Sequence, residues 1–189
     1  LLWVTAPYGR HHRGGWGPGL PGRAAWILMA LPALLTLTLI VLASPVSGQV
    51  QAWLPLMFWV FHYGYRTLVF PALLRPSGQA CPVLLVVFAI AFNILNGYNN
   101  AGALIAAGER QQPLLSFHFI AGTCLFLFGF WLHFTSDRTI RRLRGPGESG
   151  YHIPRGGQFR CVSSHNYLGE IIQWSGWALL TWSSAGVAF

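Results

Sequence analysis

The stretch AAWILMALPALLTLTLIVLAS at residues 24–44 has no charged side chain and decides the fold class. A helix needs roughly 20 apolar residues to cross the hydrocarbon core of a bilayer, and this stretch is long enough. Comparable apolar stretches follow at residues 50–74, 81–107, 113–135 and 166–189. We therefore expect an all-α, multi-span helical bundle that is integral to a membrane.

The composition of the whole chain supports this fold class. Hydrophobic residues make up 53% of the 189 residues, and charged residues make up only 8%. So little polar surface cannot cover a soluble globule of this size. The chain begins at Leu1 with apolar residues and no initiator Met. We therefore interpret it as a fragment with N- and C-terminal parts missing, and expect residues 1–189 to form a single membrane-embedded domain.

Arginine is distributed unevenly between alternate loops. The loops before residue 24, at residue 75 and at residues 136–165 carry nearly all of the twelve basic residues, whereas the loops on the other side have only Glu109 and Arg110. Basic loops stay on the cytosolic side of a membrane, so we expect these loops to face the cytosol. An endoplasmic reticulum membrane and a bacterial inner membrane fit equally. The loop at 136–165 is long enough to form an ordered cytosolic cap.

The charge and the cysteines argue against two other kinds of site. The net charge of +8 could suggest a nucleic-acid-binding protein, but the arginines lie in loops between bilayer-length stretches, with no soluble domain to present them. Cys81, Cys124 and Cys161 lie far apart and lack a paired-ligand spacing. We therefore expect no nucleic-acid partner, no metal site and no disulfide framework.

Polar side chains recur inside the apolar stretches, where they are costly and usually mark a functional site. Asn93, Asn96 and Asn100 follow the three-to-four spacing of one helical face. Taken singly, each asparagine could instead form a structural hydrogen bond between helices, and the long cationic side chain of Arg66 could instead reach the membrane surface. We expect a shared water-accessible pocket that opens to the cytosol. Its members would be His62, Tyr63, Arg66, the three asparagines, His118, His133, Asn166 and Glu170.

Several motifs, in order along nearly the whole chain, resemble the steroid 5α-reductase family. The segment NYLGEIIQW at residues 166–174, with YHIPRGG upstream at 151–157, resembles the C-terminal signature of that family. HYGYRT at residues 62–67 resembles its His-Tyr-x-x-Arg-Thr helix. APYGRH at 6–11 and PGRAAW at 21–26 resemble its first loop and the entry to the next helix. The resemblance implies about seven spans in the full chain, with five complete or nearly complete here.

The resemblance also implies an activity, which is the NADPH-dependent reduction of the C4–C5 double bond of 3-oxo-Δ4 steroids to 5α-3-oxo steroids. Conjugate reduction of an enone develops negative charge on the carbonyl oxygen, so a hydrogen-bond donor must stand there. The family pattern assigns this catalytic role to Tyr63, whose phenol is protonated at neutral pH. The expected partners are NADPH, a 3-oxo-Δ4 steroid and the lipid bilayer, and the expected state is a monomer.

Further site residues follow from matching positions. An arginine-rich loop suits an anionic dinucleotide because Arg binds phosphate in a bidentate way. The resemblance implies cofactor contacts from Asp137, Arg144, Tyr151, Asn166 and Glu170, with Asn93 and Arg75 as weaker candidates. It implies a substrate pocket that includes Tyr8, Trp26 and His62.

One position departs from the family pattern. The family has a catalytic Glu just before a Leu-Pro pair, and this chain reads MALP at residues 29–32, which places Ala30 at that position. A positioned acid typically contributes about 10²–10⁴ in rate. We therefore expect an impaired enzyme that still binds its ligands.

Two other functions stay open. One is the reduction of a different lipid double bond, such as that of a polyprenol or a long-chain enoyl thioester. The other is a small membrane transporter built on the asparagine stripe, although the inverted repeats and symmetric broken helices of that class are not visible in the sequence.

Overall fold

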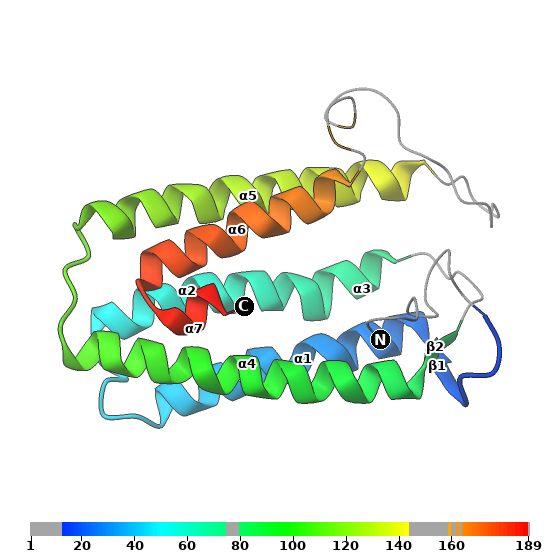
Figure 1. Cartoon of the computed structure of the whole chain (residues 1–189), viewed down its shortest axis with the longest axis horizontal. Helices are drawn as coiled ribbons and strands as arrows, with labels where there is room; N and C mark the ends of the chain where they lie inside the picture. The colour runs from blue at the N-terminus through cyan, green and yellow to red at the C-terminus, as the bar shows by residue number, and fades with distance from the viewer. Residues whose placement is uncertain (1–12, 75–79, 144–158, 160–161, 163, 189) are drawn as a thin grey trace.

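The computed structural model describes residues 13–74, 80–143, 159, 162 and 164–188, and it has the predicted all-α architecture (Figure 1). Helices α1 (Gly22–Leu42), α4 (Val83–Glu109) and α5 (Phe117–Arg142) are each long and apolar enough to cross a membrane. Large hydrophobic side chains such as Leu39 and Leu95 are exposed on them. In a bilayer these side chains face lipid, so the chain forms an integral membrane bundle.

The predicted span at residues 50–74 is helical but not a regular α-helix. Helix α2 (Val50–Gly64) continues directly into the π-helix η2 (Tyr65–Val69) and then into α3 (Phe70–Leu73). Pro71 has no backbone N–H, so the carbonyl of Thr67 one turn earlier cannot receive the usual α-helical hydrogen bond. We attribute the wider π turn to this missing donor. Such turns often lie at functional sites.

The apolar stretch at residues 166–189 forms two helices rather than the single span that its composition predicts. Helix α6 (His165–Thr181) ends where Trp182 adopts a left-handed backbone conformation with a φ of 46°. Helix α7 (Ser184–Val187) then begins, and its N-terminus is capped by Ser183 Oγ, which accepts from the N–H of Gly186 at 3.1 Å. The chain therefore turns back beside α6 instead of continuing along it (Figure 1).

Two short strands that the sequence pattern did not indicate connect the beginnings of α1 and α4. Strand β1 (Gly19–Pro21) pairs antiparallel with β2 (Ala80–Pro82), with Leu20 opposite Cys81. Each strand leads straight into its helix. The pairing therefore aligns α1 and α4, which lie side by side (Figure 1).

Helices α5 and α6 touch backbone to backbone. Gly122 and Gly129 on α5 face Gly176 and Gly169 on α6, and glycines recur two helical turns apart in each helix. A Cβ atom at Gly129 would overlap the backbone nitrogen of Gln173. Small residues allow such close approach between membrane helices. The glycines thus bring the side chains of α6 within reach of those of α5.

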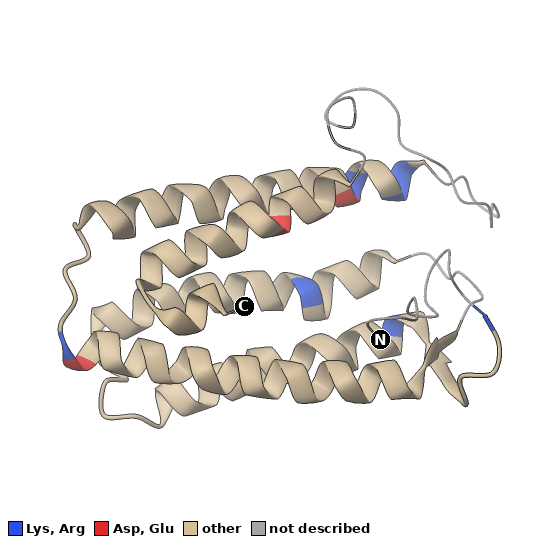
Figure 2. Cartoon of the chain, viewed as in Figure 1, with Lys and Arg blue, Asp and Glu red and all other residues tan. Residues whose placement is uncertain are grey.

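The interior of the bundle is filled by aromatic and aliphatic side chains. Trp59, Leu37, Phe126 and Trp177 are fully buried members of one hydrophobic core that joins α1, α2, α4, α5 and α6. Charged residues lie mostly near the ends of the helices, as Figure 2 shows. The few charged side chains within the bundle therefore need a specific explanation.

We predict that Gly129→Ala destabilises the protein by about 1–3 kcal/mol, because the added methyl group forces α5 away from α6. Thermal unfolding in detergent measures the change. The matched control is Gly102→Ala in α4, where an added Cβ meets nothing within 4 Å and the substitution should be neutral or slightly stabilising. Equal melting temperatures for the two variants would contradict the prediction.

Candidate active site

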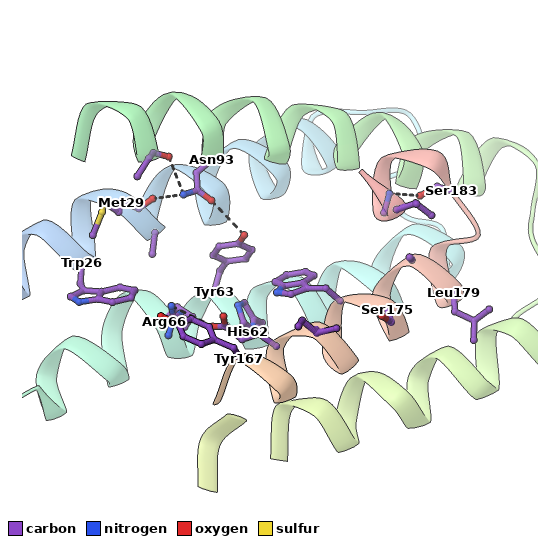
Figure 3. Close-up of a pocket in the computed structure, with 18 of the residues that line it drawn as sticks. Trp26, Met29, His62, Tyr63, Arg66, Asn93, Tyr167, Ser175, Leu179 and Ser183 are labelled. Carbon is purple, nitrogen blue, oxygen red and sulfur yellow. Dashed lines mark hydrogen bonds and ion pairs between the residues drawn. The ribbon is translucent and has the colours of Figure 1, made fainter. Parts of the chain in front are cut away.

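A large cavity of about 1460 Å³ opens between the α1–α4 pair and α6 (Figure 3). Its lining includes apolar residues of α4 and α6 and a few polar side chains, among them His62, Tyr63, Arg66, Asn93 and Glu170. Ligand pockets for one drug-sized molecule usually measure about 300–1,000 Å³. This cavity is therefore large enough for two ligands that lie against each other.

The hydroxyl group of Tyr63 lies at the cavity wall and is held from two sides. It donates to Asn93 Oδ1 at 3.5 Å and accepts from Asn96 Nδ2 at 3.3 Å. Asn93 is itself fixed, because its Nδ2 donates to the carbonyl oxygens of Met29 at 2.9 Å and Ala89 at 3.0 Å (Figure 3). The phenol thus has a defined orientation before any ligand binds.

Aromatic rings fix the position of the Tyr63 ring. Its centroid lies 4.7 Å from that of Trp59, 5.0 Å from that of His62 and 5.9 Å from that of Trp174. Such ring pairs stabilise a defined packing beyond their buried area. His62 is fixed in turn by Gln173, whose Nε2 lies 2.9 Å from His62 Nδ1. Because an amide nitrogen only donates, Nδ1 accepts and the proton of the neutral imidazole lies on Nε2.

A cluster of ionisable side chains lies next to Tyr63. Arg66 Nη2 is 3.4 Å from Glu170 Oε1, and the same carboxylate oxygen is 3.6 Å from His133 Nδ1. The other ring nitrogen of His133, Nε2, is 3.2 Å from Asp137 Oδ2. Side chains from η2, α5 and α6 therefore form one continuous polar network. Charges removed from water need such partners.

The guanidinium group of Arg66 also lies between two aromatic rings. Its Cζ is 4.5 Å from the centroid of Trp26 and 5.0 Å from that of Phe70. Attraction between a cation and an aromatic face strengthens when the pair is removed from water. Arg66 is thus held at the cavity by rings on two sides and by Glu170, rather than extending to the membrane surface.

The sequence-based site residues fall into three groups. Those that line the cavity are Trp26, Ala30, His62, Tyr63, Asn93 and Glu170. Asp137 and Asn166 do not line this cavity. Asp137 is linked through His133 to Glu170, which lines the cavity, and Asn166 is half-buried one turn before Glu170 on α6. The remaining predicted residues lie outside the part of the chain that the structure describes: Tyr8, Arg75, Arg144 and Tyr151.

The asparagine stripe does not face the cavity as a whole. Asn93 lines it, but Asn96 and Asn100 are buried behind Tyr63, with 7% and 0% exposure. His118 also lies away from the lining, where its Nε2 is 3.1 Å from Ser116 Oγ. The prediction that all the polar residues of the spans share one pocket is therefore wrong for these three, and also for His133 and Asn166, which lie outside the lining.

Sequence reasoning missed several residues of α6 that shape the site. Trp174 lines the cavity, Gln173 holds His62, and Trp177 is completely buried. Trp174 lies one turn after Glu170, so helical spacing from the carboxylate could have identified it. Among the described residues, no group of three or more His, Cys, Asp and Glu side chains is arranged to hold a metal ion.

Comparisons with known proteins give a consistent result. The family described as 3-oxo-5-alpha-steroid 4-dehydrogenase matches residues 79–189. The chain is 39% identical over 198 residues to steroid 5-alpha-reductase DET2 of Gossypium hirsutum, covering 100% of this chain and 75% of the relative. It is 39% identical over 194 residues to 3-oxo-5-alpha-steroid 4-dehydrogenase 1 of Bos taurus, with the same coverage. It is 38% identical over 190 residues to the Homo sapiens protein of that name, covering 98% of this chain and 73% of the relative.

We predict that Glu170→Gln lowers the free energy of unfolding by about 1–3 kcal/mol, since it leaves the Arg66 guanidinium without its carboxylate partner. Chemical or thermal unfolding in detergent, without added ligands, measures the loss. Glu109→Gln serves as the control because Glu109 is exposed at the end of α4, where such changes usually stay within about 0.5 kcal/mol. If both variants unfold like the unaltered protein, the ionic cluster does not stabilise the fold.

Proposed function

The chain belongs to the 3-oxo-5-alpha-steroid 4-dehydrogenase family, and we propose that it uses NADPH to reduce the C4–C5 double bond of 3-oxo-Δ4 steroids to 5α-3-oxo steroids. It is then an oxidoreductase that acts on a CH–CH bond. One observation supports the proposal best: Tyr63 and Glu170, which come from distant parts of the sequence, line the same large cavity. That cavity offers both a hydrogen-bond donor and a charged region, as a ketone substrate and an anionic cofactor require.

Tyr63 is the proposed catalytic donor. When hydride adds to the β carbon of the enone, negative charge develops on the ketone oxygen, and a donor aimed at that oxygen stabilises the transition state. The Tyr63 hydroxyl is fixed at the cavity wall, and its ring is packed on three sides. A preorganised donor does not have to be reoriented when the reaction occurs.

The apolar wall of the cavity suits the ring system of a steroid. Leu85 and Ala89 of α4 and Ile171 and Leu179 of α6 belong to its lining. Burial of apolar surface contributes about 25 cal/mol per Å². We propose that the steroid rings lie against this wall, with Trp26 and His62 in the substrate pocket as the sequence predicts. A role for Tyr8 remains a prediction.

The charged part of the cavity suits the cofactor. Arg66 is a cation held at the cavity surface, and guanidinium groups bind phosphate through paired hydrogen bonds. We propose that Arg66 and Glu170 border the NADPH site, with Asn93 beside the reacting end of the cofactor. Cofactor contacts from Asp137, Asn166, Arg75, Arg144 and Tyr151 remain predictions. Bound NADPH would supply the hydride, and the protein orients the reacting groups and excludes water from them.

Ala30 is the position where we expect this site to lack a catalytic group. It lines the cavity and is 7% exposed, but it brings no acid where the family pattern has a Glu. On that side Tyr63 has Asn93 as its partner instead. An amide cannot deliver a proton as a carboxylic acid can, so we infer slow turnover with ligand binding preserved.

The remaining assignments concern the setting of the enzyme. We propose a single membrane-embedded reductase domain that works as a monomer without a metal ion. Its basic loops and cofactor site would face the cytosol, in an endoplasmic reticulum or bacterial inner membrane. The bilayer would supply the apolar substrate.

We predict that NADPH raises the melting temperature of the detergent-purified protein, with a stabilisation of about 2.7 kcal/mol when its concentration is 100 times Kd. NADPH oxidation, followed by absorbance, should increase on addition of testosterone or progesterone and should be lost in Tyr63→Phe, which keeps the ring but removes the donor. Faster oxidation with a polyprenol or a long-chain enoyl thioester would favour those substrates instead. A protein that NADPH does not stabilise would not be a reductase of this kind.

We also predict that Ala30→Glu increases the rate of steroid reduction by about 10² or more, because it restores a positioned acid beside Tyr63. The cavity gives the longer side chain room. Ala30→Gln is the matched control, since it has the same shape but no acidic proton, and it should gain little. Steady-state kcat values decide the matter, and equal rates for the glutamate and glutamine variants would count against an acid at this position.

A further inference from the structure

A line of buried hydrogen bonds runs from α6 to the Tyr63 hydroxyl behind the cavity wall. Trp177 Nε1 is 2.7 Å from Asn100 Oδ1, and Asn100 Nδ2 is 2.9 Å from Asn96 Oδ1. Asn96 Nδ2 is 3.3 Å from Tyr63 Oη. Trp177 and Asn100 are 0% exposed, so neither can exchange its partner for water. Of these residues, Tyr63 belongs to the cavity lining.

The direction of this line is set at its α6 end. An indole N–H can only donate, so Asn100 must present its oxygen to Trp177 and can use only its amide nitrogen toward Asn96. The same reasoning makes Asn96 accept from Asn100 and donate to Tyr63. The phenol oxygen therefore accepts a hydrogen bond from behind, and its own proton must be donated forward.

The forward partner of the phenol is a weak one. The distance from Tyr63 Oη to Asn93 Oδ1 is 3.5 Å, whereas O–H···O hydrogen bonds are usually about 2.7–2.8 Å long. Both hydrogens of the Asn93 amide are committed to the carbonyl oxygens of Met29 and Ala89, so its oxygen cannot rotate away. A carbonyl oxygen in the cavity at normal hydrogen-bond distance would be a better acceptor than Asn93.

We propose that Trp177, Asn100 and Asn96 are positioning residues that commit Tyr63 to donate, so that the cavity selects a carbonyl oxygen at this point. Donors that act in series polarise one another, which strengthens the last hydrogen bond of the line. The proposal rests on the proposed function only for the identity of the ligand, a 3-oxo steroid. It assigns the preference for the ketone to residues that do not touch the ligand.

The experiment compares two ligands that differ only in the acceptor atom, testosterone and its 3-deoxy analogue. Their Kd values are measured in detergent with NADP⁺, which prevents reduction during the measurement. The unaltered protein should bind testosterone about tenfold more tightly than the analogue, as one well-made buried hydrogen bond provides.

Trp177→Phe keeps an aromatic ring and removes the N–H, and Asn100→Leu interrupts the line at its middle. Each should reduce the testosterone preference by about three- to tenfold and leave the Kd of the 3-deoxy analogue unchanged. The double variant should lose no more than the larger single effect, since both changes break the same line. Asn99→Leu is the matched control, because Asn99 is exposed on the same helix, and it should keep the full preference.

The outcomes separate the two proposals. If the unaltered protein binds neither ligand, the proposed function fails. If it binds both ligands equally, or if Trp177→Phe and Asn100→Leu keep the full preference while still showing NADPH-dependent thermal stabilisation, the positioning role fails and the proposed function stands. A general loss of packing would weaken the binding of both ligands alike, and that result would also overturn the positioning role.

Discussion

The close contact between α5 and α6 is the constraint on which the site depends. Glycines at the interface allow the two backbones to touch, and Gly169 lies immediately before Glu170. With any larger residue there, α6 would stand farther from α5, and the carboxylate of Glu170 would lose His133. The same approach fixes the rotation of α6, which turns Trp174 toward the cavity and Trp177 into the core.

Two polar networks meet where α2 passes into η2. Tyr63 ends the uncharged line through the asparagines, whereas Arg66, one turn later, belongs to the ionic cluster with Glu170. Within a bilayer no water can replace a missing partner, so the buried polar groups of these networks rely on partners from the protein, several of which lie on other helices. The networks thereby hold the helices in one arrangement, and they also separate a neutral region of the cavity from a charged one.

Much of this arrangement can be predicted from the sequence, and there are physical reasons why the rest cannot. Hydrophobic length predicts α1, α4 and α5, and a polar residue within an apolar stretch predicts that Tyr63 and Glu170 share a cavity, which both of them line. The β1–β2 pair depends on contacts between distant residues, which no local pattern encodes. Gln173 and Trp177 were missed because an amide or indole in a helix looks like ordinary packing until its partner is known.

The π-helix η2 has a consequence for how related chains should be compared. A π turn takes up more residues than an α turn, so every side chain after it is rotated relative to a regular helix. Whether Phe70 can pack against Arg66 thus depends on Pro71, which is not part of the cavity lining. Replacement of that proline in a related chain would therefore shift the phase of the whole helix end.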